Sequence, residues 1–156
     1  MDKEKTLWTG SPSQVLNLGA FILILIIAAA VVVVSILFLP LLLILLIVPL
    51  VMLIINYLKV KSEVFEVTTQ RLRKTTGIFS KQTEDLELYR VRDYKILQPF
   101  FLRLFGLGTI ELITIDKSSP HVLIPAVKNP KELIDIIREN VEKMKTAKGV
   151  RELDVE

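Results

Sequence analysis

Apolar and charged residues divide this chain into two parts. From Leu16 to Leu58 there is no Asp, Glu, Lys, Arg or His, a run of 43 residues. One helix of that length would be roughly 65 Å long. The hydrocarbon core of a bilayer is about 30 Å thick and needs only about 20 residues. The run therefore predicts two membrane-crossing helices that form a hairpin.

Pro40 lies near the middle of this run and predicts the turn, because proline interrupts the hydrogen bonds of a helix. Within the hairpin, 16–58, we place the helices at about 17–37 and about 41–58. Pro49 then falls inside the second helix. Because the turn 38–40 is apolar, a re-entrant hairpin stays open as an alternative. Small residues offer a surface for close contact between helices: Ala28, Ala29, Ala30 and Ser35.

Lysines stand on both sides of the apolar run: Lys3, Lys5, Lys59 and Lys61. Because basic residues next to membrane helices stay on the cytoplasmic side, the sequence predicts a multi-pass plasma-membrane protein with both termini in the cytoplasm. Trp8 and Tyr57 are expected as interfacial anchors at that face. Residues 1–15 are then a cytoplasmic N-terminal segment.

After the hairpin, residues 59–145 show short β-branched segments separated by turns, which is typical of antiparallel strands. Gly77 predicts a turn, and Pro99 predicts the start of a short helix over 100–105 that ends at Gly106. The expected strands are 64–68, 71–76, one or two pieces within 78–88, then 94–98, 109–115 and 121–127.

An amphipathic helix is predicted to follow these strands. Asn129 is expected as its N-cap, with Pro130 in the first helical position and Glu132 completing a pattern like a capping box. An apolar stripe recurs at helical spacing: Leu133, Ile136, Ile137, Val141 and Met144. Residues 146–156 lose the stripe and are expected to be a flexible tail. Six or seven strands plus this helix predict a membrane-anchored α+β protein with a β-barrel or bent sheet plugged by the helix.

Short motifs follow one another in a recognisable order. They are 7–13 (LWTGSPS), 68–72 (TTQRL), 76–80 (TGIFS), and 88–93 followed by 101–109 (FLRLFGLGT). Over about residues 6–144 the chain resembles the bacterial pleckstrin-homology-like (PH-like) family in which two transmembrane helices precede the domain. The resemblance implies a seven-stranded antiparallel barrel capped by a C-terminal helix, and it implies no settled activity.

Basic residues gather early in the expected PH-like domain, where an anionic leaflet would attract each by about 1 kcal/mol. Arg71 and Arg73 share a strand face while Lys74 points the other way, which disfavours convergence on one head group. General attraction to the membrane, a specific lipid pocket and a plain solvated face all stay open. The candidate lipid contacts are Lys59, Lys61, Arg71, Arg73, Lys74 and Lys81.

The apolar segment 100–105 is the second candidate surface. Its aromatic residues Phe100, Phe101 and Phe105 form either the core under a short helix or an exposed patch for lipid or a protein partner. Arg103 is the only charged residue in the segment, so the short helix has little polar surface. Phe100 or Phe101 is the ring expected to be exposed.

The composition offers little for catalysis. There is no Cys, His121 is the only histidine, and no glycine-rich phosphate loop is present. Glu84, Asp85 and Glu87 indicate a solvated strand edge. We therefore expect no enzyme activity, no cofactor and no metal. The net charge of +3 is too small to indicate nucleic-acid binding.

These features favour a membrane-tethered binding or scaffold module that acts at the cytoplasmic face through protein or anionic-lipid contacts. The expected partners are membrane lipid and a membrane or membrane-associated protein, with a homo-oligomer left open. A structural subunit of a larger membrane complex, assembled through the hairpin, is the alternative.

Overall fold

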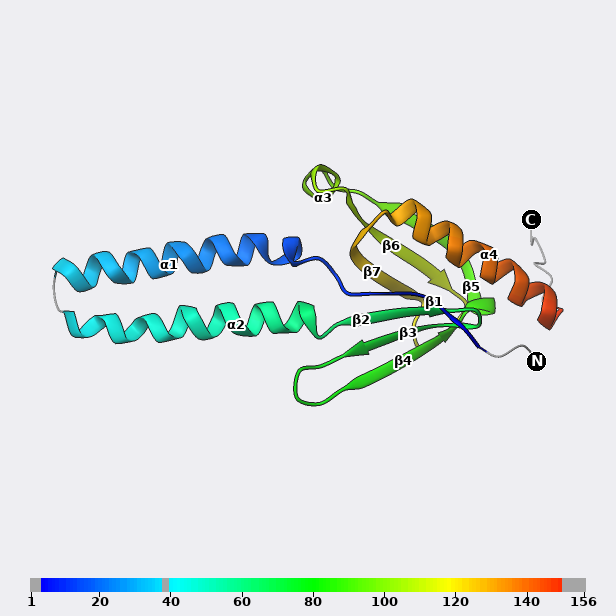
Figure 1. The fold of residues 1–156 in the computed structure, drawn as a ribbon, viewed down its shortest axis with the longest axis horizontal. Helices are drawn as coiled ribbons and strands as arrows, with labels where there is room; N and C mark the ends of the chain where they lie inside the picture. Colours follow the sequence, from blue (N-terminus) through cyan, green and yellow to red (C-terminus); the bar gives the residue numbers. More distant parts are fainter. Residues whose placement is uncertain (1–3, 38–39, 150–156) are drawn as a thin grey trace.

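The computed structural model describes residues 4–37 and 40–149, which form a helical hairpin joined end-on to a β-rich domain (Figure 1). The hairpin contains the 3₁₀ turn η1 (Gln14–Asn17), α1 (Leu18–Leu37), the 3₁₀ segment η2 (Pro40–Leu46) and α2 (Ile47–Lys61). The domain contains β1 (Thr6–Gly10), β2 (Val64–Thr68), β3 (Arg71–Thr76), β4 (Gln82–Glu87), η3 (Leu88–Arg90), β5 (Val91–Leu97), α3 (Phe100–Leu104), β6 (Leu107–Thr114), β7 (His121–Lys128) and α4 (Pro130–Lys148).

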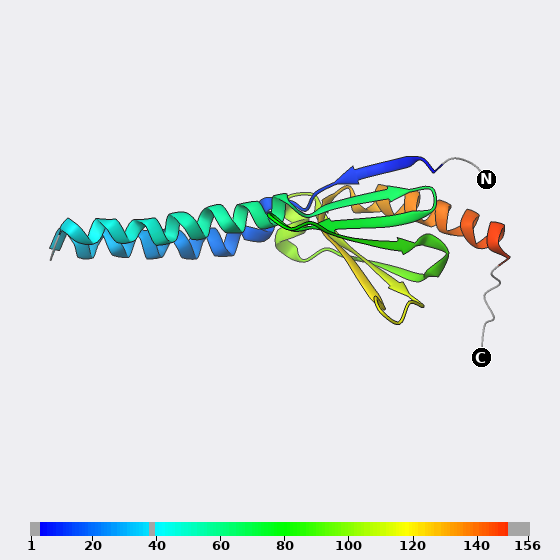
Figure 2. The same ribbon diagram turned by 90° about the horizontal axis from the view of Figure 1, so that it is seen from below.

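The two legs of the hairpin run side by side and antiparallel (Figures 1 and 2). Ile24 and Ser35 of α1 and Pro49 of α2 are buried between them. Most of the other large apolar side chains are exposed, and Leu25 and Ile36 expose 71% and 75% of their surfaces. So much contiguous apolar surface requires lipid or another protein around it.

Each leg is long and apolar enough to cross a membrane, judged by length and composition alone. Gln14–Leu37 has 24 residues and Pro40–Lys61 has 22. At 1.5 Å per residue the first leg is about 36 Å long, against a hydrocarbon core of about 30 Å.

The ends of the predicted helices differ in detail from the structure. Residues 38–39 of the expected turn lie outside the described residues. The second leg begins as 3₁₀ helix and becomes α-helical at Ile47, so Pro49 lies in the first turn of α2, where a missing N–H costs least. Of the small residues expected between the helices, Ser35 is buried and Ala28 is half-buried, whereas Ala29 and Ala30 are exposed.

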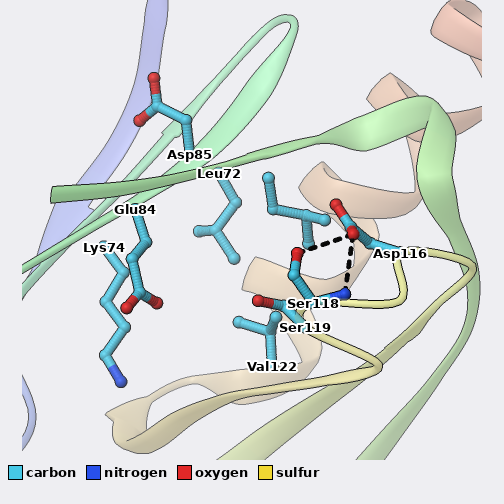
Figure 3. A pocket seen from close by; sticks show the side chains of 9 residues that line it. Leu72, Lys74, Glu84, Asp85, Asp116, Ser118, Ser119 and Val122 are labelled. Carbon is cyan, nitrogen blue, oxygen red and sulfur yellow. Dashed lines mark hydrogen bonds between the residues drawn. The ribbon is translucent and has the colours of Figure 1, made fainter.

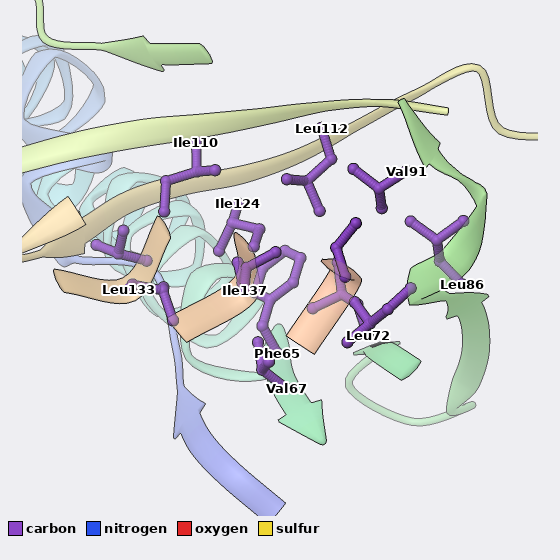
Figure 4. Packing of buried hydrophobic residues seen from close by; sticks show 13 residues of the cluster. Phe65, Val67, Leu72, Leu86, Val91, Ile110, Leu112, Ile124, Leu133 and Ile137 are labelled. Atoms are coloured by element: carbon purple, nitrogen blue, oxygen red, sulfur yellow. The ribbon is translucent and has the colours of Figure 1, made fainter. Parts of the chain in front are cut away.

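Two antiparallel sheets form the domain, with strand orders β1-β2-β3-β4 and β5-β6-β7. The expectation of a closed barrel is wrong. The short turn η3 separates β4 from β5, and no backbone ladder joins the two sheets among the described residues. The sheets instead face each other across a shared core, and α4 lies over this core (Figures 1 and 4).

Strand β1 is the element that the sequence pattern does not predict. Thr9 pairs with Glu66 and Gly10 pairs with Phe65 of β2. Trp8 of β1 is half-buried and packs against the core, and its ring lies so close to Gly10 that a side chain at residue 10 would collide with it. The hairpin is therefore an insertion between two adjacent strands of one sheet.

The core joins side chains from both sheets and from α4 (Figure 4). Phe65 of β2, Ile110 of β6 and Ile124 of β7 are completely buried, as is Ile137 of α4. The stripe of α4 buries Leu133, Ile137 and Val141, and Met144 packs against the cluster. Ile136, expected in the stripe, is not part of this cluster. Ile134 of α4 packs against the cluster in its place.

The ends of α4 correct two expectations. Asn129 precedes the helix in a left-handed conformation (φ 47°, ψ 55°), and its side chain forms no capping hydrogen bond, so the capping box is absent. The helix also continues through residues 146–148 of the expected tail. It stops at Gly149, which adopts the positive φ of 65° that glycine tolerates. Residues 150–156 lie outside the described residues.

Candidate functional site

The candidate site is the end of the domain that meets the hairpin. The strand register determines what gathers there: Val64, which follows the end of α2, pairs with Thr75, and Thr76 pairs with Gln82. The β3–β4 loop, 77–81, therefore lies at this end. In the second sheet, α3 connects Leu97 to Leu107, and it also lies at the hairpin end (Figure 1).

Hydrogen bonds fix the roots of the hairpin to each other and to the domain. The side chain of Gln14 donates to the carbonyl oxygen of Tyr57 over 3.0 Å, and Asn17 donates to that of Asn56 over 2.9 Å. The backbone N–H of Ser13 donates to the carbonyl oxygen of Ala126 over 3.1 Å. Ala126 has a positive φ of 47° and lies near an irregularity in the β6–β7 register. The segment before α1 is thereby attached to the second sheet.

Three of the six candidate basic residues form no ion pair in the described part of the chain: Lys59, Lys61 and Lys81. Lys59 and Lys61 occupy the last turn of α2, and Lys81 closes the β3–β4 loop. The ammonium group of Lys61 lies 5.7 Å from the ring centroid of Tyr57. All three therefore lie at the hairpin end with charge available for an external anion.

The two arginines of β3 are neutralised by acidic neighbours. Arg71 contacts Glu4 and Asp85, each over 3.0 Å. Arg73 contacts Asp85 over 2.9 Å and Glu66 over 3.7 Å. The hydrogen bond from Arg73 is the largest cause that lowers the pKa of Asp85, and the hydrogen bond from Arg71 lowers it further. Asp85 is exposed on the edge strand β4, as expected, and serves there as the shared counter-ion of both arginines.

Lys74 points to the opposite face of β3, as strand alternation requires. It contacts Glu63 over 3.2 Å, and its ammonium lies 5.6 Å from the ring centroid of Phe65. The three basic residues of β3 therefore do not converge on one external point, and each already has an acidic partner.

A pocket of about 370 Å³ opens where the two sheets do not join (Figure 3). At its rim Asp116 accepts hydrogen bonds from the backbone N–H and the hydroxyl of Ser118, over 3.1 and 2.8 Å. The hydroxyl of Ser118 is the largest cause that lowers the pKa of Asp116. The lining residues are Leu72, Lys74, Glu84, Asp85, Leu86, Asp116, Ser118, Ser119 and Val122. The sequence pattern gives no sign of this pocket, because strands β3 and β4 and the β6–β7 loop meet only in the fold.

The apolar segment 100–105 is exposed and is not part of the core. No residue of α3 is buried, and Phe100 and Phe101 expose 68% and 67% of their surfaces. Their rings meet edge to face, with centroids 5.7 Å apart. Phe105 is also more than half exposed. The structure thus decides between the two alternatives for this segment in favour of an exposed patch.

The remaining polar candidates have local roles. His121 lies on β7 with Nδ1 2.9 Å from a carboxylate oxygen of Glu111, its neighbour on the adjacent strand β6. Among the described residues there is no group of three or more His, Cys, Asp or Glu side chains that could hold a metal ion.

Comparison with known families decides the identity of the chain. The family model described as "Bacterial PH domain" matches residues 13–141, which include the hairpin and most of the domain. The chain belongs to the bacterial PH domain family. The resemblance inferred from the sequence motifs is thereby confirmed, with two apolar helices ahead of the strands β2–β7.

Among solved structures, this bacterial PH domain is similar to a DUF1696 family protein with a pleckstrin-homology domain from Shewanella loihica PV-4, whose crystal structure was determined at 2.00 Å resolution. The two share 10% sequence identity at a TM-score of 0.40, over 55% of this chain and 72% of that chain. A search of curated proteins found no match. PH domains are in general binding modules without enzymatic activity, which agrees with the local roles of the polar residues.

Proposed function

We propose that this bacterial PH domain protein is a membrane-tethered binding or scaffold module. Its hairpin crosses the plasma membrane, both termini are cytoplasmic, and the domain acts at the cytoplasmic face through protein or anionic-lipid contacts. The observation that supports this most is the insertion of the apolar hairpin between the paired strands β1 and β2.

This insertion gives the domain two covalent connections to the hairpin. Ser11–Ser13 leads from β1 into η1, and Ser62–Glu63 leads from α2 into β2. Two short connections, further fixed by the Ser13–Ala126 hydrogen bond, allow much less rotation than one flexible linker. A domain held at the membrane in one orientation has a high effective concentration for partners there, so weak contacts suffice.

Lipid contact is supported by Lys59, Lys61 and Lys81, which lie at the hairpin end without ion pairs in the described residues. Each adds about 1 kcal/mol of attraction to an anionic leaflet. Arg71 and Arg73 give no such support, since Asp85 already binds both. General surface attraction is therefore favoured over a specific lipid pocket on β3.

Protein contact is supported by strand β4. It is the last strand of its sheet, and the pocket of about 370 Å³ lies along it. An edge strand presents unpaired backbone N–H and C=O groups, and an extended segment of another protein pairs with such an edge. Glu84 in the pocket lining forms no ion pair within the described residues and offers a negative charge for side-chain selection.

Photo-crosslinking in native membranes tests the proposal. A photoreactive amino acid at Glu84, on β4, is expected to capture one discrete protein, whereas the same group at Glu142, on the exposed face of α4, captures only random neighbours. A chain reduced to its hairpin is expected to lose that partner. If the partner instead co-purifies with the hairpin alone, the chain is a structural subunit that assembles through its helices.

Topology is tested separately with tags at both ends. The chain is expected to resist extraction from membranes by alkaline carbonate, and both tags should be cleavable by protease only from the cytoplasmic side. A tag that is cleaved from the opposite side contradicts the proposed orientation.

A further inference from the structure

Two exposed apolar tips flank the root of the hairpin. One is Phe79 in the β3–β4 loop, whose side chain is completely exposed. The other is the surface of α3 and the residue after it, formed by Phe100, Phe101, Leu104 and Phe105. In Figure 1 the β3–β4 loop and α3 both lie at the end of the domain from which α1 and α2 emerge, on opposite sides of the helices.

Local backbone geometry presents Phe79 to the outside. Gly77 adopts a φ of 114°, and a side chain at this position would collide with the carbonyl oxygen of Ser80. This tight turn holds the loop close to the ends of β3 and β4 and leaves Phe79 at its tip. Because this side chain is completely exposed, Phe79 adds nothing to the packing of the core.

The second tip is a single helical turn with little polar surface. Pro99 precedes it, and Gly106 ends it with a φ of 66°. Leu102 is half-buried and attaches the turn to the domain, while Leu104 exposes 70% of its surface. This amount of grouped apolar surface on a small domain marks a contact site.

Each tip also carries a cation. Lys81 is two residues from Phe79, and Arg103 lies within α3; neither forms an ion pair in the part of the chain that the structure describes. Aromatic rings beside Lys or Arg suit the boundary between lipid head groups and acyl chains, where the ring enters the apolar layer and the cation meets phosphate.

We propose that both tips insert into the leaflet that the hairpin enters, so that the domain rests on the bilayer at three places: the hairpin root, Phe79 and α3. This inference rests on the proposed membrane tether. A lipid surface is favoured over a protein or a second copy because both tips lie at the end of the domain from which the helices emerge, on either side of them in Figure 1. A bilayer surface perpendicular to the hairpin at its root therefore meets the β3–β4 loop and α3 together.

Site-directed spin labelling tests this docking in the full chain. The sequence contains no cysteine, so each introduced cysteine is unique. Phe79→Cys, Ser80→Cys and Phe101→Cys report on the tips, and Ser80→Cys keeps the Phe79 ring in place. Ile115→Cys is the matched water control. Ile115 is apolar, exposes 61% of its surface and lies at the end of the second sheet away from the hairpin. Leu25→Cys, at an exposed residue in the middle of the first leg, reports on the hairpin.

Power saturation of these labels in vesicles of phosphatidylcholine and phosphatidylglycerol compares collisions with oxygen, which concentrates in lipid, and with a nickel chelate, which stays in water. The labels at 79, 80 and 101 are expected to collide more with oxygen, as at 25, and the label at 115 more with nickel. Adding Phe79→Ser to the Ser80→Cys chain should shift its label toward water while the thermal unfolding temperature stays unchanged.

The outcomes separate the docking from the tether. If the labels at 79, 80 and 101 behave like the label at 115 while that at 25 is in lipid, docking is overturned and the tether stands. If the label at 25 also collides mainly with nickel, the tether itself fails. A third outcome is that the labels at the tips prefer oxygen only at a high ratio of protein to lipid and lose this preference when the labelled protein is diluted with lipid. In that case the tips contact a second copy of the chain, and lipid docking is overturned.

Discussion

Asn17 joins the two roots of the hairpin: its Nδ2 donates to the carbonyl oxygen of Asn56 over 2.9 Å, across a separation of 39 residues. The same amide group donates to Gln14 over 2.8 Å, and Asn56 in turn donates to the carbonyl oxygen of Met52 over 2.8 Å. Asn17 is buried, with 9% of its surface exposed. This small polar network fixes the separation of α1 and α2 at the point where each connects to the domain.

Asn17→Ala is expected to destabilise the hairpin root by about 1 kcal/mol, the usual value of a side-chain hydrogen bond between membrane helices. Thermal unfolding in detergent micelles, followed by circular dichroism, measures the effect. Leu18→Ala is the control, because the Leu18 side chain is exposed on the outside of the hairpin. Equal losses in both variants would mean that the network adds nothing beyond side-chain size.

The domain is expected to fold without the hairpin only when β1 is retained. We predict that residues 4–12, joined by a linker of about four residues to 62–149, form a folded monomer, because Gly10 and Phe65 are already opposite each other. The segment 62–149 alone loses β1 and the Trp8 ring from its core. Circular dichroism and gel filtration compare the two chains. A stable monomer from 62–149 alone would show that β1 is dispensable.

Asp85→Asn is expected to reduce stability near neutral pH by about 1 kcal/mol, since it removes a half-exposed counter-ion and leaves Arg71 beside Arg73. The folded state lowers the pKa of Asp85 below its ordinary value of 3.8. Its contribution to stability is therefore present above that value and is lost as the pH falls through the lower pKa of the folded state.

Urea unfolding of the hairpin-free domain between pH 7 and pH 2 measures this contribution. The wild-type domain should lose stability toward low pH more steeply than Asp85→Asn, and the two should converge at the acidic end. Parallel curves would show that Asp85 is not the group that titrates. Glu84→Asn is the matched control, because this neighbouring carboxylate forms no ion pair within the described residues.

Gly77→Ala is expected to destabilise the domain by about 2 kcal/mol through backbone strain at positive φ and collision with the carbonyl oxygen of Ser80. Gly106→Ala provides the comparison, because Gly106 also has a positive φ but a side chain there would enter open space. Its expected cost is about 1 kcal/mol. Urea unfolding of the hairpin-free domain measures both. A smaller loss at Gly77 than at Gly106 would contradict the tight turn at the β3–β4 tip.

The sequence predicted those features that depend on local pattern. Strands β2 and β3 and the helix α4 have their expected positions because alternation and a long apolar stripe are visible in the sequence. Strand β1 escaped prediction because five residues carry little pattern, and their partner β2 follows only after the whole hairpin. The local signal at Asn129 was misleading, since its backbone is left-handed and its side chain forms no capping hydrogen bond.

The candidate site was harder to predict because it depends on contacts between strands. Arg73 lies opposite Asp85 in the β3–β4 register, and only this register shows that the basic residues of β3 are neutralised. The sequence left segment 100–105 open between core and exposed patch, because one helical turn is too short to reveal a buried face, although it singled out Phe100 or Phe101 as the ring expected to be exposed. Phe79 was not singled out, since a lone phenylalanine in a turn has no periodic context.

The pairing of Thr9 with Glu66 has a consequence for how the protein is made. Strand β1 leaves the ribosome first and has no partner until both helices and β2 have been synthesised. If only one of the two helices entered the bilayer, β1 and β2 would remain in different compartments, and the sheet could not form. If the hairpin crosses the membrane as proposed, completion of the domain during biosynthesis thus depends on insertion of both helices together, and a chain with one inserted helix would expose an incomplete sheet to proteases.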